Sequence, residues 1–283
     1  MIEAFVFQSR RPGPNLLVLG GVHGDEVAGT VAINRLISGL KSGQLQLLSG
    51  TLTLAPVCNP RARAANTRQT EDNLNRVIRY WENPDSYEKR LGCEIAGLID
   101  KADDILDLHS THCPGEDPFA FMDYPSDHNM AMARCAPVDF ILVGWPDIYG
   151  EQSAIDNFST EAYAHKVGKN GITVECGYHR DENAGEIAYS TIRNYMTHIG
   201  MLDGRAPIRH EQKFVKIFYM AIKDIEGRFV RNFKHMDSLK SGEPIIVCEN
   251  GNTIRAPKDS YIILPQHAAK IGTEWYYLGE LYS

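Results

Sequence analysis

The chain of 283 residues lacks any apolar run near the roughly 20 residues that a membrane-spanning helix needs. It also lacks a cluster of Lys and Arg, and its formal net charge is −7, so a nucleic acid is not expected as a partner. Its first residues do not have the basic and then apolar layout of a signal peptide. Its six cysteines are scattered without a CxxC pair, which is typical of reduced thiols in the cytoplasm. We therefore expect a globular, cytoplasmic protein that binds neither membranes nor nucleic acids.

The pattern of apolar runs in the sequence changes near residue 204. Residues 1–204 alternate apolar, strand-like runs with amphipathic helical patterns, which predicts an α/β domain with a mixed central sheet flanked by helices. Residues 205–283 hold shorter apolar runs separated by glycine turns, which is typical of a smaller, mainly β domain. The sequence therefore predicts two domains.

Periodicity and turn residues give approximate bounds to the elements of the first domain. The expected strands are residues 16–20, 50–58, 103–112, 119–124, 140–145 and 171–179. The expected helices are residues 26–40, 86–102, 159–167 and 184–202. The polar stretch at residues 59–76 is expected to be a loop.

Three of the expected strands run directly into side chains that can bind a metal. His23 and Glu26 form an H-x-x-E pair after the first strand, His109 ends another, and Glu175 ends a third. The carboxyl ends of strands in an open sheet converge on one crevice, so these side chains are expected to meet there. Two imidazoles and a carboxylate hold zinc with one coordination position open for water, which is the arrangement of catalytic zinc sites. The sequence thus predicts a catalytic zinc site.

Other interpretations of single residues remain open at this point. An H-x-x-E pair alone is a weak signal, and a histidine at a strand end is often a hydrogen-bonded structural residue. The glycine turn at residues 20–26 lacks both the P-loop pattern and the G-x-G-x-x-G fingerprint, which argues against a phosphate loop. Asp107, two residues before His109, is a candidate to hold the far nitrogen of a ligand imidazole. It is the conjunction of these residues that favours a metal site.

Two arginines and an asparagine in the polar stretch form a second candidate group, suited to binding a carboxylate. Arg68, Asn75 and Arg76 are expected at the same edge of the sheet, and arginine presents a rigid fork that matches a carboxylate. Arg61 and Arg63 are interpreted instead as residues of a solvated surface.

The order of these motifs resembles the zinc carboxypeptidase superfamily and, more narrowly, the succinylglutamate desuccinylase and aspartoacylase family. The matching pieces are GGVHGDE (20–26), NPRA (59–62), TRQTEDNLNR (67–76), DLHST (107–111) and VECG (174–177). The stretch EWYYLG (274–279) is similar to a paired-tyrosine segment of aspartoacylases. The resemblance implies a zinc-carboxypeptidase-like α/β domain at residues 1–204 and a β-rich domain at residues 205–283 that caps the entrance of the active site.

The resemblance implies a role for each matching residue at the metal. His23, Glu26 and His109 would bind one zinc ion per chain. Glu175 would be the general base that takes a proton from water and later passes one to the leaving amine. Arg68 would stabilise the oxyanion.

The resemblance also implies the substrate contacts. Asn75 and Arg76 would clamp the free carboxylate of an amino-acid substrate, and Tyr277 would add a weaker contact. The function implied is a zinc-dependent hydrolase that cleaves the amide bond of an N-acyl amino acid, a carbon–nitrogen bond other than a peptide bond. Its partner would be this small molecule, and assembly into a homo-oligomer is compatible with the sequence.

Two alternative functions stay open. The same site would serve a metallocarboxypeptidase or an amidase of cell-wall peptides, and a chain that has lost catalysis would bind only a metal or a ligand. Among the single residues, Asp25 and His179 have no assigned role. His112 and Cys113 could bind a second metal, although no further carboxylate cluster is evident in the sequence.

Overall fold

The computed structural model describes residues 1–112, 114–152 and 158–282, and the contacts of the chain form two compact units. The first unit contains Met1–Ile141 and Ala154–Gln212, and the second contains Leu142–Ser153 and Lys213–Ser283. The domain division at residue 204 stays a prediction, and each unit is described separately.

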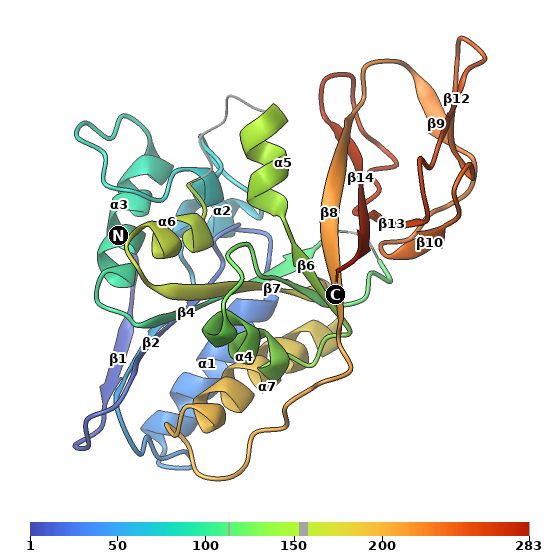
Figure 1. Cartoon of the computed structure of the whole chain (residues 1–283). Helices are drawn as coiled ribbons and strands as arrows, with labels where there is room; N and C mark the ends of the chain where they lie inside the picture. The colour runs from blue at the N-terminus through green and yellow to red at the C-terminus, as the bar shows by residue number, and fades with distance from the viewer. Residues whose placement is uncertain (113, 153–157, 283) are drawn as a thin grey trace. The chain divides into compact units, whose positions relative to one another are not determined.

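A mixed sheet forms the centre of the first unit (Figure 1). In spatial order its strands are β1 (Phe5–Gln8), β3 (Thr51–Ala55), β2 (Asn15–Gly20), β4 (Asp104–Thr111), β7 (Asn170–Tyr178) and β5 (Phe119–Phe121). The four inner strands are parallel, whereas β1 and β5 pair antiparallel with their neighbours. The predicted mixed central sheet is confirmed, and β2, β4 and β7 lie side by side with their carboxyl ends at one edge. A further strand, β6 (Phe140–Val143), crosses the boundary between the two units.

Helices cover both faces of this sheet (Figure 1). One face carries α1 (Ala28–Lys41), α4 (Asp127–Cys135) and α7 (Glu182–His198), and the other carries α3 (Tyr87–Ile99) and α6 (Thr160–Lys166). Alternate residues of the parallel strands point to opposite faces, so each face supplies apolar side chains to its helices. Under α3 the core includes Leu17, Leu19, Leu91, Ile95 and Ile105.

The sequence predicted most of these elements but missed several. The segment at residues 59–76 was expected to be a loop, yet it contains α2 (Pro60–Ala65) and the short η1 (Leu74–Arg76). Helix α2 begins because the Asn59 side chain accepts a hydrogen bond from the Ala62 backbone and Pro60 takes the first helical position. Helix α4 and helix α5 (Trp145–Gln152) were not expected, and β1 was missed as well.

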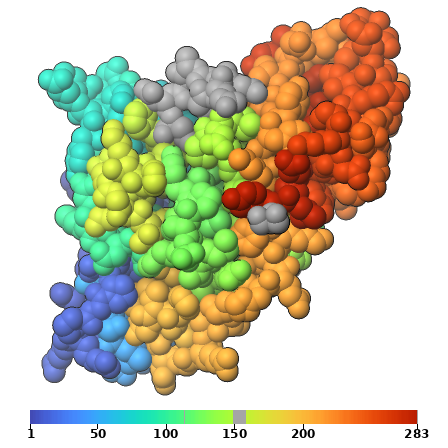
Figure 2. All heavy atoms as spheres, in the orientation of Figure 1, coloured from blue at the N-terminus to red at the C-terminus, as the bar shows by residue number. Residues whose placement is uncertain are grey.

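The second unit is rich in β-strands, as the sequence predicted. One sheet contains β8 (Lys213–Ile222), β14 (Glu274–Leu281), β13 (Ser260–Ile263) and β10 (Asp237–Leu239), and a smaller sheet contains β12 (Thr253–Arg255), β11 (Pro244–Cys248) and β9 (Gly227–Phe229). Buried Phe233, Ile246, Ile262 and Trp275 belong to its core. These C-terminal strands form a compact body of side chains (Figure 2). No helix in the described part of the chain has both the length and the apolar character to cross a membrane.

Candidate metal centre

The carboxyl ends of β2 and β4 bring three potential metal ligands together. His23 follows β2, Glu26 lies just before α1, and His109 is the sixth residue of β4. The ligand atoms of these three residues all lie within 4.8 Å of one another. Each residue is buried, with 2–3% of its surface exposed. The structure thus places the three predicted ligands in one buried group.

Short distances join the ligand atoms within this group. His23 Nδ1 lies 2.8 Å from Glu26 Oε1, and His109 Nδ1 lies 2.9 Å from Glu26 Oε2. The two Nδ1 atoms are 3.2 Å apart. The backbone N–H of Ser110 donates to Glu26 Oε2 at 3.1 Å and so fixes the orientation of the carboxylate. The group therefore presents two imidazole nitrogens and a carboxylate toward one point.

Glycines shape the turn that carries His23 and Glu26. Gly21 has a φ of +58°, a conformation that glycine adopts at little cost. Gly24 lies so close to α2 that a Cβ atom there would be 2.1 Å from the Ala62 carbonyl carbon. The turn can therefore aim both ligands inward only with glycines at these positions.

A carboxylate holds the far nitrogen of His109. His109 Nε2 donates to Asp107 Oδ2 at 2.9 Å, and the hydroxyl of Thr160 donates to the same oxygen at 2.7 Å. A carboxylate can only accept, so Nε2 carries a proton, and in the neutral form of the ring Nδ1 is the atom left to bind a metal. The sequence left open which histidine Asp107 would hold, and the structure shows that it is His109.

An amide oxygen does the same for His23. His23 Nε2 lies 3.0 Å from Asn73 Oδ1, and that oxygen also accepts a hydrogen bond from the Asn75 backbone N–H at 3.0 Å. The second contact identifies the atom as the amide oxygen rather than the nitrogen. His23 Nε2 must therefore donate, and the Nδ1 atom of the neutral ring faces Glu26 as a lone pair.

Protonation of the two histidines does not provide a hydrogen between every pair of facing polar atoms in this group. Burial, opposed by the charge of Glu26, lowers the pKa of His23 to about 4, so this ring is neutral near pH 7. Burial also opposes charge on His109, but Asp107 and Glu26 outweigh it and raise its pKa well above the ordinary value. The bare Nδ1 of His23 then faces the Glu26 carboxylate across 2.8 Å without a proton between them. A cation among the three ligands removes this repulsion, and the donor set fits a zinc ion.

Glu175 lies beside this group on the neighbouring strand. Its Cα is paired in register with that of His109 where β7 runs parallel to β4. Burial, together with the charge of Glu26, raises the pKa of Glu175 to about 8. Its Oε2 atom is buried and has no hydrogen-bond partner among the described residues. A carboxyl with a pKa near neutrality is suited to proton transfer.

The predicted substrate residues of the polar stretch reach the same region. Arg68 Nη1 donates to Glu26 Oε1 at 3.1 Å, although 41% of its side chain is exposed. Asn75 is buried, and its side-chain oxygen accepts from the Thr160 backbone N–H at 3.1 Å. Arg76 follows on η1 and donates to the Asn75 carbonyl oxygen at 2.8 Å. Arg68 thus contacts the ligand group directly, and Asn75 lies next to Asn73, which holds His23.

Tyr277 belongs to the other unit. It is buried on β14, where its ring lies 4.6 Å from that of Trp145. Its predicted substrate contact stays a prediction.

Sequence reasoning missed two residues that orient the ligands. Asn73 holds His23, and Thr160 contacts both Asp107 and Asn75. Asn73 is the N-cap of η1, and its place in an N-x-N sequence was a visible signal. Thr160 gave no such signal, because it lies far along the chain and reaches the site only through the packing of α6.

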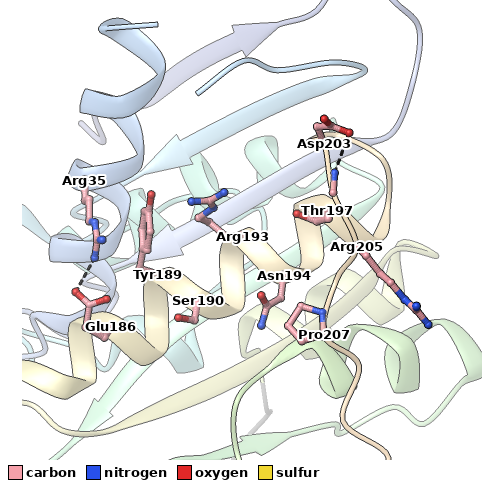
Figure 3. A pocket seen from close by; sticks show the side chains of 11 residues that line it. Arg35, Glu186, Tyr189, Ser190, Arg193, Asn194, Thr197, Asp203, Arg205 and Pro207 are labelled. Carbon is pink, nitrogen blue, oxygen red and sulfur yellow. Dashed lines mark hydrogen bonds and ion pairs between the residues drawn. The ribbon is translucent and has the colours of Figure 1, made fainter. Parts of the chain in front are cut away.

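A separate hollow of about 380 Å³ lies along α1 and α7 (Figure 3). Arg35, Arg193 and Arg205 are among its lining residues, and Arg35 pairs with Glu186 at 2.6 Å. Its lining contains neither histidine nor cysteine and shares no residue with the ligand group. This hollow is therefore separate from the candidate metal centre.

Comparison with known proteins identifies similar chains. The family model described as the succinylglutamate desuccinylase/aspartoacylase catalytic domain matches residues 12–199. An N-alpha-acetyl-L-2,4-diaminobutyric acid deacetylase of Halomonas elongata is 27% identical over 213 residues, which cover 71% of this chain and 59% of the relative. A succinylglutamate desuccinylase of Pseudomonas fluorescens is 26% identical over 191 residues, which cover 59% of this chain and 56% of the relative. The match thus spans less than two thirds of either relative.

The fold is also similar to that of solved structures. A crystal structure described as succinylglutamate desuccinylase/aspartoacylase from Rhodobacter sphaeroides superposes with a TM-score of 0.79 at 18% identity. The superposition covers 99% of this chain and 90% of the other. At this level of identity the likeness shows the fold alone.

Proposed function

This chain belongs to the succinylglutamate desuccinylase/aspartoacylase family, and on that premise we propose that it is a zinc-dependent amidohydrolase that removes the acyl group from an N-acyl amino acid. The observation that carries the proposal is the arrangement of His23, Glu26 and His109. Their hydrogen bonds direct two imidazole nitrogens and a carboxylate toward one point. The names of the two relatives describe enzymes that act on N-acyl amino acids, which supports this substrate class.

His23, Glu26 and His109 would hold one zinc ion per chain. When bound, zinc supplies Lewis-acid polarisation of the scissile carbonyl and lowers the pKa of water at the open position. Asp107 and Asn73 keep the two imidazoles in the tautomer that binds a metal, because each accepts a hydrogen bond from the far nitrogen.

Glu175 would be the general base. Its carboxylate would take the proton of the attacking water and then deliver that proton to the amine nitrogen as the amide bond breaks. The raised pKa supports both steps, because a group that titrates near neutral pH both accepts and releases a proton readily.

Arg68 would stabilise the negative charge that develops on the carbonyl oxygen. Its guanidinium already reaches Glu26 of the ligand group and is partly exposed, so it can turn toward a substrate.

Asn75, Arg76 and Tyr277 would bind the rest of the substrate. The oxygen of the Asn75 amide is engaged by Thr160, which directs the NH₂ group of Asn75 to donate to a carboxylate. Arg76 would add a charge-assisted hydrogen bond to the same carboxylate. The contact of Tyr277 rests on the sequence resemblance alone.

Two alternatives use the same residues. A metallocarboxypeptidase or a cell-wall-peptide amidase would need the same zinc and the same base but would accept a longer substrate. A protein that only binds a metal or ligand would have no use for Glu175, whose buried oxygen lacks a hydrogen-bond partner among the described residues. The location of the protein in the cytoplasm stays a prediction.

Hydrolysis of a panel of N-acyl amino acids and short peptides by the zinc-loaded protein, with and without chelator, tests the proposal. We expect release of the free amino acid from at least one N-acyl amino acid, loss of this release with chelator, and its return with added zinc. Cleavage of peptides alone would favour the carboxypeptidase alternative. If no substrate is hydrolysed while Glu175→Gln binds substrate as wild type does, the enzyme proposal fails.

A further inference from the structure

A continuous series of hydrogen bonds joins the far nitrogens of the two candidate imidazole ligands. In order, its members are His23, Asn73, Asn75, Thr160, Asp107 and His109. Its donor–acceptor distances lie between 2.7 and 3.1 Å, and in each contact an N–H or O–H faces an accepting oxygen. The series therefore passes through Asn75, a residue of the proposed carboxylate clamp, on its way from one imidazole to the other.

The residues that have no assigned role take no part in this series. Asp25 Oδ2 lies 3.8 Å from His112 Nδ1, and the rings of His112 and His179 lie edge to face. Cys113 lies outside the described residues. The series is therefore independent of the second metal that His112 and Cys113 suggested.

Thr160 forms the middle of the series because it donates through two separate groups. Its hydroxyl donates to Asp107 Oδ2 at 2.7 Å, and its backbone N–H donates to Asn75 Oδ1 at 3.1 Å. Thr160 is the first residue of α6, where a backbone N–H has no acceptor within the helix and can bond elsewhere. The residue is fully buried. A single residue thus contacts both the partner of His109 and the proposed clamp.

In the described part of the chain, only Thr160 and His109 hold the Asp107 carboxylate. Asp107 is fully buried, and its Oδ1 atom has no hydrogen-bond partner among the described residues. Its Oδ2 atom accepts from His109 Nε2 and from the Thr160 hydroxyl. Without this hydroxyl, the carboxylate would be held only by the imidazole that it has to orient. Loss of such an outer contact typically weakens metal binding or activity by about 10- to 100-fold.

The backbone also joins the start of α6 to the segment that carries Asn75. The Ile78 N–H donates to the Phe158 carbonyl oxygen at 2.9 Å, and Val77 and Phe158 form a β-bridge. Phe158 precedes Thr160 by two residues, and Val77 follows Asn75 by two. Main-chain contacts thus fix the position of Thr160 relative to Asn75, in addition to the hydrogen bond between them.

We propose that Thr160 is a positioning residue that makes zinc affinity at His109 depend on the carboxylate clamp at Asn75. Its hydroxyl holds Asp107, and through it His109, in the orientation that binds a metal, while its N–H joins this arrangement to Asn75. The inference rests on the proposed function, which gives Asn75 its substrate and His109 its metal. Such a coupling is reciprocal: a substrate carboxylate that orders Asn75 strengthens zinc binding, and zinc strengthens binding of the carboxylate.

Thr191 provides a matched control. It is a fully buried threonine like Thr160, and its hydroxyl donates to the Ile187 carbonyl oxygen at 2.9 Å within α7. Thr191→Val therefore removes a buried threonine hydroxyl that has no contact with Asp107. Thr160→Val removes the hydroxyl of the series at nearly constant size, and Thr160→Ser keeps it.

The zinc affinity of the full chain, measured without substrate by competition with a chromophoric chelator, tests the positioning role. We expect Thr160→Val to bind zinc about 10- to 100-fold more weakly than wild type. Thr160→Ser and Thr191→Val should both bind zinc as wild type does. Thermal melting of the metal-free variants checks that they are folded, and Thr160→Ala replaces the valine variant if that one is not.

Asn75→Ala tests the coupling to the clamp. The change removes the acceptor of the Thr160 N–H, so we expect zinc affinity to fall by about 2- to 10-fold with no substrate present. The same change made in Thr160→Val should have a smaller effect, because the hydroxyl that connects Asn75 with Asp107 is already gone.

Three results would overturn the inference. Wild-type zinc affinity in Thr160→Val, or an equal loss in Thr160→Ser, would refute the positioning role, and an equal effect of Asn75→Ala in both backgrounds would refute the coupling. A wild type that binds zinc but hydrolyses no N-acyl amino acid would refute the proposed function and leave the positioning role in place. Hydrolysis by wild type together with undiminished zinc affinity in Thr160→Val would refute the positioning role alone.

Discussion

A histidine lies beside a carboxylate at each end of β4, but the hydrogen bonds around the two pairs differ. At the start of the strand, buried Asp104 accepts hydrogen bonds from the Tyr195 hydroxyl at 2.6 Å and from Asn170 at 3.0 Å, and His128 Nε2 lies 2.8 Å from its Oδ1 atom. Both oxygens of Asp104 thus have partners, and the Tyr195 hydroxyl also lies 3.1 Å from His128 Nε2. Nothing in this network requires a ligand.

At the other end of β4 the hydrogen bonds leave lone pairs facing one another. Asp107 and Asn73 accept from the far nitrogens of His109 and His23, so both near nitrogens face Glu26, and the near nitrogen of the neutral His23 ring carries no proton. Burial of an incompletely satisfied polar group is costly, and such groups are retained where they bind or react. Burial of a His–carboxylate pair is therefore not in itself a sign of function. The sign is a set of lone pairs that the protein alone does not satisfy.

Removal of a histidine should show the largest difference between the two ends of β4, measured as bound zinc and as activity. His109→Ala removes one of the three proposed metal ligands, so we expect loss of bound zinc and a rate no higher than that of chelator-treated wild type. His128→Ala, at the opposite end, should keep both zinc and activity. Elemental analysis and an assay of amino-acid release measure the two effects. Equal loss of zinc in both variants would show that the two ends do not differ in the way proposed.

Loss of the proposed general base should lower turnover without loss of bound zinc. Glu175→Gln keeps the size of the side chain but cannot accept a proton, so we expect zinc to stay bound while kcat falls by about 10²–10⁴-fold. Zinc content and kcat are measured on the same preparation. A variant that turns over at the wild-type rate would remove Glu175 from the mechanism, and one that loses zinc would instead assign Glu175 to the metal.

Arg76 should affect substrate binding more than turnover. Arg76→Ala removes a charge-assisted hydrogen bond worth about 1.5–3 kcal/mol, which corresponds to a rise in KM of roughly 10- to 100-fold. Arg193→Ala, in the hollow along α1 and α7, is the matched control and should leave KM unchanged (Figure 3). Steady-state kinetics with an N-acyl amino acid and with its amide, which lacks the free carboxylate, separate the two roles. An unchanged KM in Arg76→Ala would mean that another residue clamps the carboxylate.

Glu175 should also make the stability of the metal-free protein depend on pH. Its pKa is raised to about 8 in the folded chain, whereas the unfolded value is about 4.3. The folded state therefore holds an extra proton between these values, and the stability this gives is complete below about pH 4 and lost as pH rises through about 8. We expect the Tm of chelator-treated wild type to fall by several degrees more between pH 5 and pH 8 than that of Glu175→Gln. An equal change in Tm between the two pH values for both proteins, measured by calorimetry, would contradict this.

The positions of the candidate ligands could be predicted from the sequence, whereas the residues that orient them could not. His23, His109 and Glu175 follow apolar runs, and the ends of parallel strands must meet at one edge of the sheet. Thr160 reaches the site only through the packing of α6, which no local pattern encodes. Asp104 and Asp107 are both acids in one expected strand, and only the tertiary hydrogen bonds reveal that one is structural and the other orients a ligand.

The smallest effect is expected where the polar network is complete. Tyr195→Phe removes a hydroxyl that donates to Asp104 at 2.6 Å but leaves the contacts of Asp104 with His128 and Asn170 in place. Loss of one hydrogen bond to a charged group should lower the free energy of unfolding by about 1.5–3 kcal/mol, which corresponds to a fall in Tm of roughly 3–12 °C. Zinc content and kcat should not change, because no ligand depends on this network. A change in either, measured beside the denaturant or thermal unfolding curve, would mean that the two ends of β4 are coupled rather than independent.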